Sequence, residues 1–497
     1  MEAQLTVTGD ITKELEAIAG KGQVATDEAT LDRFAQDESW MVPKRPDWVV
    51  KVKNTDQVQK VVQLANQQKV PVVPRSSGMG FHGSGIPEEG GIVIDMQGMN
   101  RVLRIDTRNK WALVEPGVTY GQLQKELKPQ GFRAVNPLLP HPQKSVMTCL
   151  LEKNPRLTSK MHLDEIILTM QLILPTGDRF RTGSLAVPVP GLKPEEVPDQ
   201  THSSLCNALG PGIDWWRLLT GSEGSLAITT AMNFKISPLP SQQSLRFLPA
   251  KTLEELVEPA YLILRREIGN EFFILNKHNL AAILAGEDDD LNAIKEQLPQ
   301  FCLITCLDAG EWYPDEKIAY QENALQEVCQ RFNCEPTTQL PPIVEADRKI
   351  AGMLSQPWSD GVYWKFRYSG GCWDILLLTP LDKASRWMSV VREVAAEHSY
   401  PFDDVGIYLQ PKQRGRAFQL EFGFPVNRDN VKESQKVKAL FHETAQRLIN
   451  AGAFMYRPYG SLAEMVYPRT GNLHNSIRKI KGILDPNNVL NPGKLAL

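Results

Sequence analysis

The chain has 497 residues, of which 42% are hydrophobic, and its formal net charge is −3. A chain of this length exceeds what one hydrophobic core organises and indicates two or three domains. The near-neutral charge without a basic patch argues against a nucleic-acid binder, and the apolar runs are too short to span a membrane. The N-terminus lacks the basic-then-apolar pattern of a signal peptide, so we expect a cytoplasmic protein.

The cysteines of the chain are scattered and form no CxxC or CxxCH motif. Iron–sulfur clusters, c-type haem and structural zinc depend on such closely spaced ligands. We therefore expect no metal site on this chain, and we interpret Cys302/Cys306 and Cys329/Cys334 as reduced thiols of the core.

The first elements in chain order are predicted to be helices. Residues 10–35 carry apolar side chains at helical spacing, beginning with Ile11 and Leu15. Residues 55–69 form a clearer amphipathic pattern, with one apolar face that consists of Val58, Val61, Val62 and Leu64. Apolar runs at residues 70–73 and 92–94 follow and predict two buried strands.

A glycine-rich loop joins these two strands and is the most informative motif of the chain. Its glycines leave backbone N–H groups open to one side, and such a nest suits a diphosphate. Arg75 and the hydroxyls of Ser76 and Ser77 add donors beside it. The loop is therefore predicted to be a phosphate cradle, although a glycine-rich connection without a ligand has the same composition. The four glycines are Gly78, Gly80, Gly83 and Gly85.

Residues 78–83 also satisfy the pattern GxGxxG of Rossmann dinucleotide-binding folds. That pattern requires the glycines to open a helix whose N-terminus holds the pyrophosphate. Here a cluster of breakers, residues 86–91, leads into the second strand instead. We therefore do not predict a Rossmann fold.

The remaining elements are predicted to alternate between strands and helices. Residues 111–126 indicate a strand, a Pro-Gly turn and a helix, residues 171–177 a strand closed by a turn, and residues 221–240 a turn before a long strand. Residues 184–212 are rich in Pro and Gly and are predicted to be irregular. After Ser241 we expect strands at 301–307 and 373–380, and helices at 383–397 and 433–450. Residues 478–497 indicate a helix, breakers and a short tail.

In this order and spacing the elements resemble the vanillyl-alcohol oxidase and p-cresol methylhydroxylase (PCMH) family of flavoproteins. The resemblance covers roughly residues 45–240 and 450–497, and 145–152, 181–194 and 210–214 strengthen it. It implies an α+β fold with a two-lobed PCMH-type FAD-binding domain and an antiparallel-sheet cap domain that binds substrate. The implied parts are an N-terminal helical segment (1–45), the FAD-binding domain (46–240), the cap (241–450) and a C-terminal segment that returns to the FAD domain (451–497).

The resemblance also implies the residues that contact FAD. They are Pro74, Arg75, Ser76, Ser77, Gly78, Met79, Gly80, Phe81, Glu115, Pro116, Gly117, Val118, Ser145, Val146, Glu152, Ile228 and Lys494. Some family members bind the flavin covalently through a His or Tyr of the cap. The matching region here, residues 371–375, has neither, so we expect noncovalent FAD, and a link through His82 stays open.

Three residues are candidates for catalysis. Tyr456-Arg457 matches a pair that anchors the substrate's phenolate in members of the family that oxidise 4-alkylphenols. An Arg beside a Tyr hydroxyl stabilises an oxyanion, although an Arg stacked on an aromatic ring at a domain seam shows the same dipeptide. His162 falls where the family has its catalytic aspartate, and it could act as a base or be an ordinary surface histidine.

The resemblance implies hydride transfer from an activated C–H of a small oxygenated substrate, a 4-alkylphenol or aromatic alcohol, to FAD without nicotinamide. One alternative is the flavin subunit of a glycolate or D-lactate type 2-hydroxy acid dehydrogenase. Such subunits carry a histidine-rich element that residues 405–424 lack. Another alternative is an electron-relaying subunit of a larger complex. Because the chain carries no cluster or haem motif, we expect an oligomer or complex with a separate electron acceptor, namely a cytochrome, an iron–sulfur subunit or an electron-transfer flavoprotein.

Overall fold

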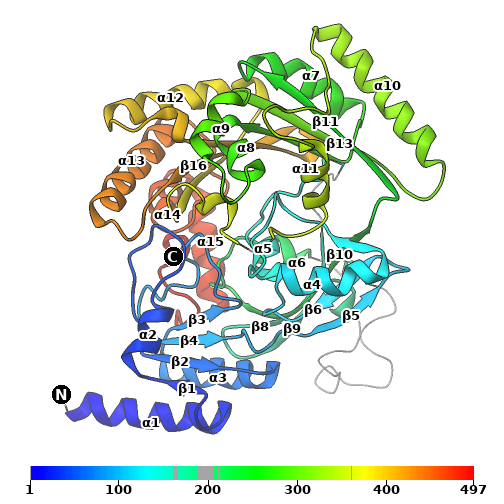
Figure 1. The fold of residues 1–497 in the computed structure, drawn as a ribbon. Helices are drawn as coiled ribbons and strands as arrows, with labels where there is room; N and C mark the ends of the chain where they lie inside the picture. The colour runs from blue at the N-terminus through cyan, green and yellow to red at the C-terminus, as the bar shows by residue number, and fades with distance from the viewer. Residues whose placement is uncertain (1, 161–165, 187–205, 211–212, 360) are drawn as a thin grey trace.

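The computed structural model describes residues 2–160, 166–186, 206–210, 213–359 and 361–497. Three β-sheets organise these residues (Figure 1). Two sheets formed by residues 24–238 lie at the bottom of the view, and a third sheet with its helices lies above them. The predicted α+β fold with a two-lobed lower part and an antiparallel cap is confirmed.

The first sheet has the strand order β1-β2-β4-β3, with β2, β4 and β3 parallel. Its strands are β1 (Val24–Ala25), β2 (Trp48–Lys51), β3 (Val72–Arg75) and β4 (Ile92–Asp95). Helix α3 (Thr55–Gln68) connects β2 to β3 and buries its valines, which confirms the predicted amphipathic helix. The helix begins at Asn54, whose side chain accepts a hydrogen bond from the backbone N–H of Gln57.

The prediction of helix across residues 10–35 is wrong in its middle. Helix α1 (Glu2–Ala19) ends before Gly20, strand β1 follows, and a second helix, α2 (Glu28–Phe34), comes after it. Gly20 and Gly22 adopt φ values of +102° and +78°, which a continuing helix does not allow.

The second sheet is antiparallel around the long strand β10, which pairs with β6, β7 and β8. Its strands are β5 (Val102–Asp106), β6 (Trp111–Val114), β7 (Phe132–Ala134), β8 (Ile167–Ile173), β9 (Arg179–Arg181) and β10 (Ile228–Pro238). The helices of this lobe are α4 (Tyr120–Leu127), α5 (Val146–Leu151) and α6 (Trp215–Leu219). The strands predicted near 111, 171 and 228 and the helix after the Pro-Gly turn are confirmed.

The cap sheet is antiparallel, in the order β11-β13-β12-β15-β16-β14. Its strands are β11 (Gln242–Ala250), β12 (Glu271–Asn276), β13 (Phe301–Ala309), β14 (Cys372–Thr379), β15 (Gly406–Lys412) and β16 (Ala417–Pro425). The helices around it are α7 (Glu254–Arg265), α8 (Lys277–Leu284), α9 (Leu291–Gln297), α10 (Pro314–Phe332), α11 (Ala346–Leu354), α12 (Ala384–Glu397) and α13 (Val431–Asn450).

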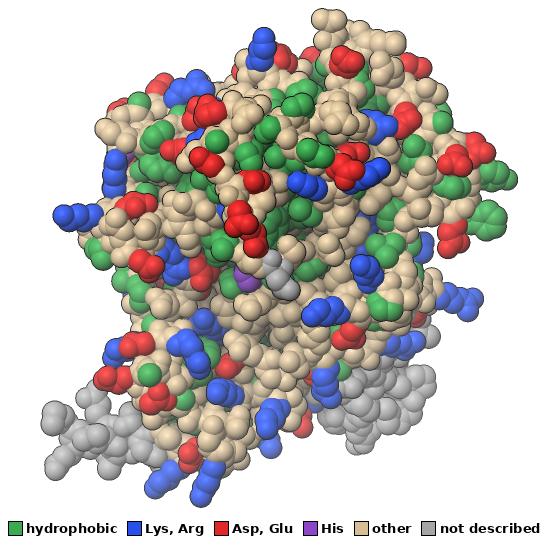
Figure 2. Space-filling model, in the orientation of Figure 1, with side chains coloured by type: hydrophobic (Ala, Val, Ile, Leu, Met, Phe, Trp, Pro, Cys, Tyr) green, Lys and Arg blue, Asp and Glu red, His purple; other side chains and the backbone are tan. Residues whose placement is uncertain are grey.

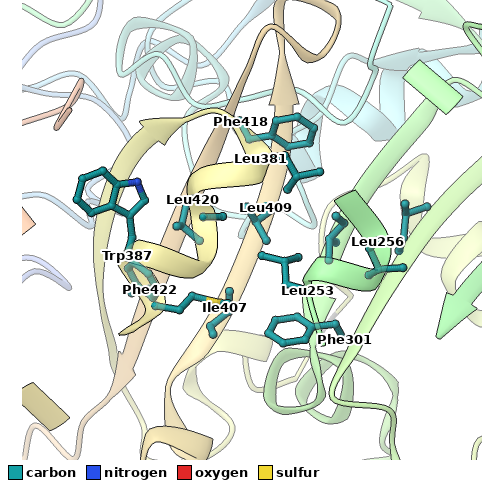
Figure 3. Packing of buried hydrophobic residues seen from close by; sticks show 14 of the residues in the cluster. Leu253, Leu256, Phe301, Leu381, Trp387, Ile407, Leu409, Phe418, Leu420 and Phe422 are labelled. Carbon is teal, nitrogen blue, oxygen red and sulfur yellow. The ribbon is translucent and has the colours of Figure 1, made fainter. Parts of the chain in front are cut away.

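Both faces of the cap sheet are buried, which explains why its strands are almost continuously apolar. On one face, Ile407, Leu409 and Phe422 pack against helices that include α7 and α12 (Figure 3). On the other face, Phe273 and Ile304 pack against α8 and α11. The sequence FCLITCL of β13 therefore serves two cores, with alternate residues on each.

The C-terminal segment contains α14 (Ser461–Val466) and α15 (Asn472–Leu484) and then returns to the first sheet. The backbone N–H of Val72 donates to the carbonyl of Val489 at 2.7 Å, and that of Asn491 donates to the carbonyl of Val72 at 2.8 Å. Beyond this pairing, Lys494 Nζ donates to the carbonyl of Gly83 at 2.9 Å. The tail is thereby held against the glycine-rich loop.

Candidate active site

The glycine-rich loop between β3 and β4 is clamped onto the start of α5. Ser76 Oγ and Thr148 Oγ1 lie 2.6 Å apart, and the backbone N–H of Ser145 donates to Ser77 Oγ at 3.0 Å. Ser145 also caps α5, since its Oγ accepts from the N–H of Thr148 and donates to the carbonyl of Pro116. These bonds join the loop of the first sheet to the second lobe.

A cavity of about 720 Å³ of empty space lies behind this clamp, between the first two sheets. Its wall combines apolar side chains with hydroxyls, and Gly224 closes one side at a φ of +76°. A Cβ at Gly224 would lie 2.6 Å from Pro74 Cγ, so the backbone approaches closely here. The lining residues include Pro74, Ser76, Ser84, Pro116, Thr148, Glu152, Ser222, Glu223, Ile228 and Tyr459.

A second cavity, of about 650 Å³, lies between the lower lobes and the cap. In the middle of the visible face, Figure 2 shows acidic side chains at the lower edge of the cap and a histidine beneath them. Glu152 lines both cavities, so the two meet at its side chain. The second cavity is lined by residues that include Phe81, His82, His141, Lys144, Asn154, Tyr363, Trp364, Lys365, Asp374, Tyr408, Gln419, Glu421 and Arg457.

Arg457 is the central cation where the two cavities meet, with an exposed fraction of 3%. Its Nη1 donates to Asn154 Oδ1 at 2.8 Å and its Nη2 to His82 Nε2 at 3.0 Å. The Nε–H group is buried and has no partner among the described residues. Glu152 lies 3.9 Å from Nη2 and accepts at 2.9 Å from Lys144.

His82 is a neutral imidazole in this environment. Burial lowers its pKa well below the ordinary value, and the positive charges of Arg457, Lys144 and Lys365 lower it further. Because an arginine can only donate, Nε2 of His82 is the acceptor, which leaves the proton on Nδ1.

On the cap side, Lys365 lies between two buried carboxylates. Its Nζ is 2.6 Å from Asp374 Oδ2 and 2.5 Å from Glu421 Oε1. Burial raises the pKa of Glu421 above its ordinary value. Gln419 donates to Glu421 at 3.2 Å and accepts from the hydroxyl of Tyr456. The cavity wall therefore carries a cluster of buried ionisable groups in addition to Arg457.

The predicted catalytic residues reach the cavity in different ways. Arg457 lines it directly, whereas Tyr456 contacts it through Gln419. His162 lies outside the described residues. Sequence reasoning missed Lys144, Tyr363, Lys365, Asp374 and Glu421, and the one available signal was a charged residue within the aromatic run YWKF.

The aromatic part of the wall consists of Phe81, Tyr363 and Trp364. The Tyr363 ring lies 6.0 Å from that of Phe81, 5.9 Å from that of Trp364 and 5.1 Å from that of His141. Burial raises the pKa of Tyr363, so its hydroxyl stays protonated and can donate a hydrogen bond. This part of the wall suits a flat, partly polar molecule.

Comparison with known proteins identifies the fold. Residues 46–183 match a family model described as an FAD binding domain. The whole chain superposes on p-cresol methylhydroxylase with substrate bound, with a TM-score of 0.83 at 18% identity, covering 100% of this chain and 98% of the other. The chain has the fold of the PCMH-type FAD-linked oxidoreductases.

Two relatives are similar to this chain in sequence. An uncharacterised FAD-linked oxidoreductase of Mycobacterium tuberculosis is 26% identical over 298 residues, which is 59% of this chain and 60% of the relative. The glycolate oxidase subunit of Bacillus subtilis is 21% identical over 509 residues, 98% of this chain and 97% of the relative. The chain thus spans about 60% of the first relative and nearly all of the second.

FAD is the cofactor of this PCMH-type domain, and the first cavity fits it. It lies beside the glycine-rich loop and is lined by apolar side chains together with several hydroxyls and carboxyl groups. The hydroxyls of Ser76, Ser84 and Thr148 line it, and both carboxyl oxygens of Glu223 are buried without a partner in the described chain. Such unsatisfied groups indicate a polar ligand.

The predicted FAD contacts divide into two groups. Pro74, Ser76, Pro116, Glu152 and Ile228 line the first cavity, and Phe81 and Glu152 the second. The other described positions make contacts within the protein. Arg75 donates to the carbonyl of Phe34 at 3.1 Å, and Glu115 pairs with Arg101 at 2.7 Å. A Cβ at Gly117 would lie within 2.8 Å of three backbone oxygens, so packing alone requires glycine there.

The last of these positions support the loop or the core. Ser77 accepts from the backbone of Ser145, and Lys494 holds the loop at Gly83. Val118 and Val146 are buried in the second lobe. Gly78 lies beside Arg75 and Gln97, Gly80 lies against Asp37, and Met79 between them is partly exposed.

Within the described residues, no helix is long and apolar enough to cross a membrane. In the same part of the chain, no group of three or more His, Cys, Asp or Glu side chains is arranged to hold a metal ion.

Proposed function

We propose that this chain oxidises a 4-alkylphenol or a related aromatic alcohol, with FAD as the hydride acceptor. The observation that carries the proposal is the buried Arg457, whose Nε–H lacks a partner at the junction of the FAD cavity and an aromatic-walled second cavity. The name of p-cresol methylhydroxylase, whose fold this chain shares, supports the same substrate class.

The residues of the second cavity would have two roles, binding of the substrate's oxygen and binding of its ring. Arg457 would bind the phenolate oxygen, because a guanidinium stabilises an oxyanion by charge-assisted hydrogen bonds and favours loss of the phenol proton. Phe81, Tyr363 and Trp364 would hold the ring and exclude water, which strengthens the interaction with Arg457. FAD, which the first cavity would hold, would supply the acceptor for the hydride, that is, for two electrons and one proton.

Proton transfer would fall to the cap side. His82 Nε2 already accepts from Arg457, so this nitrogen is not available as a base in the observed arrangement. Asp374 and Glu421 are two of the three buried carboxyl groups that line the same cavity, the third being Glu152, and Lys365 lies between Asp374 and Glu421. We propose that this cluster, or His162, takes the role that an aspartate has in the resembled family.

The second candidate is oxidation of a 2-hydroxy acid, as the name of the Bacillus subtilis relative suggests. Three cations, Lys144, Lys365 and Arg457, line the second cavity and could hold a carboxylate. Each already faces a carboxylate of the chain, at Glu152 or at Asp374 and Glu421, so the cavity carries no clear excess of positive charge. Strands β15 and β16 place Tyr408 and Gln419 there and contain no histidine.

A panel of substrates tests the proposal. Anaerobic mixing of the FAD-loaded protein with 4-alkylphenols, benzylic alcohols and 2-hydroxy acids should bleach the flavin with the first two classes. Bleaching by hydroxy acids alone would support the second candidate, and bleaching by NADH alone would overturn both. No bleaching by any member of the panel would support the electron-relaying subunit.

We also propose that electrons leave to a separate protein, a cytochrome, an iron–sulfur subunit or an electron-transfer flavoprotein, in the cytoplasm. The name of the Bacillus subtilis relative as a subunit supports a complex. Pull-down from the native source should recover such a partner. Stoichiometric peroxide formation by the isolated chain, as fast as substrate bleaches the flavin, would contradict this.

A further inference from the structure

Glu223 is a buried acid that the proposed chemistry does not use. It lies on the turn between α6 and β10, at a φ of +52°, and lines the first cavity. Its backbone carbonyl accepts at 2.6 Å from Asn491 Nδ2 of the C-terminal tail, which fixes the turn. Neither carboxyl oxygen has a hydrogen-bond partner in the described chain, although both are buried. The backbone of the turn is therefore held in place, while the carboxyl group in the cavity wall is left without a partner in the described chain.

The charged groups around Glu223 come from four other parts of the chain. Lys494 of the tail is the one cation among its described charged neighbours, and its Nζ is already bound to Glu88 and to the carbonyl of Gly83. The acids facing it are Glu88 of the glycine-rich loop, Asp37 after α2 and Glu152 after α5, and the phenols of Tyr459 and Tyr467 lie beyond. Burial raises the pKa of Glu223 to about 8, and the neighbouring carboxylates act in the same direction. At neutral pH the side chain is an uncharged acid that can both donate and accept.

We propose that Glu223 binds FAD as a neutral carboxylic acid, donating its O–H to an acceptor oxygen of the cofactor, and that ionisation of Glu223 weakens FAD binding at alkaline pH. FAD offers acceptors along its whole length, in the diphosphate, the ribityl chain and the flavin ring. A protonated carboxyl can donate its O–H to such an acceptor, whereas a carboxylate can only accept and would repel a diphosphate. The inference rests on FAD occupying the first cavity and is independent of the substrate.

The linkage between protonation and binding fixes the sign of the effect. If the neutral form binds FAD and the ionised form does not, affinity is constant below the pKa of the apoprotein. Above it, affinity falls about tenfold for each pH unit, because one proton must be taken up for every FAD bound. The protein should therefore release FAD on the alkaline side, above about pH 8.

The test is FAD titration of the apoprotein, followed by quenching of flavin fluorescence, from pH 6.5 to 9.5. Wild type should show the alkaline loss. Glu223→Gln, which keeps a neutral donor and acceptor of the same shape, should bind at pH 7 within about threefold of wild type and show no alkaline loss. Glu223→Leu should bind about ten- to hundredfold more weakly at pH 7. Glu89→Gln, at an exposed acid of the same region, is the matched control and should behave as wild type.

Titrations with ADP and with FMN identify the half of FAD that Glu223 contacts, because only that half should reproduce the pH dependence. A flat pH profile for wild type, or an alkaline loss that persists in Glu223→Gln, would overturn the proposal. So would unchanged affinity in Glu223→Leu. These measurements use no substrate, so they stay informative if the proposed oxidation of phenols fails.

Discussion

Replacement of Arg457 by lysine tests the oxyanion site directly. The guanidinium holds Asn154 and His82 at 2.8 and 3.0 Å and still has a buried Nε–H to offer. A lysine ammonium is a point charge and cannot span both partners while a third donor points at the substrate. Loss of one preorganised donor to developing negative charge costs about 2 to 4 kcal/mol of transition-state stabilisation. We therefore expect kcat/KM to fall by about 30- to 1,000-fold in Arg457→Lys.

The assay is the rate of anaerobic flavin reduction by the substrate that the panel identifies. Arg469→Lys is the control, since Arg469 is exposed and its Nη1 donates to Asn450 on the surface. It should leave the rate unchanged. If Arg457→Lys reduced the flavin within threefold of the wild-type rate with an unaltered flavin spectrum, the oxyanion role of Arg457 would be refuted.

Three further predictions concern the cofactor and the buried histidine. Gly224→Ala should weaken FAD binding at least tenfold, because its Cβ would press on Pro74 in the cavity wall; Gly131→Ala, with the same φ of +76° and no atom within 4 Å, carries the same strain and should not. Acid precipitation should release all FAD into the supernatant, and flavin that stays with the protein but is released in His82→Asn would show a covalent link. The pKa of His82 is depressed in the folded state, so protonation of the unfolded chain below about pH 6.5 should destabilise wild type relative to His82→Asn by about 1.4 kcal/mol per pH unit. Urea unfolding at pH 7 and pH 5 measures this difference. Equal losses of stability in both proteins would contradict the argument from burial.

Much of the backbone could be predicted from the sequence because its signals are local. The periodicity of residues 55–69, the apolar run 301–307 and the breakers at 86–91 each specify an element within a few residues, and each prediction is confirmed. The one clear error is the helix predicted through Gly20, where Gly20 and Gly22 are local signals for the end of a helix. The resemblance of ordered motifs extended these local signals to the α+β fold and to FAD.

The site was accessible from the sequence only in part, because its residues are far apart along the chain. Arg457 and His82 are separated by 375 positions, and Lys365 meets Glu421 across 56. Conversely, Glu115 was predicted to contact FAD, but its carboxylate pairs with Arg101 and lines neither cavity.

The sequence by itself thus determined most of the strands and helices and the glycine-rich loop, since these follow from periodicity and from the backbone freedom of glycine. The cofactor class followed from the resemblance that the order of these motifs carries. Only the tertiary structure decided which charged groups share the second cavity and which acid is left unpaired in the first. The physical reason is that burial and pairing, which set protonation and hydrogen bonding, arise only when three sheets and a returning tail exclude water from the same space.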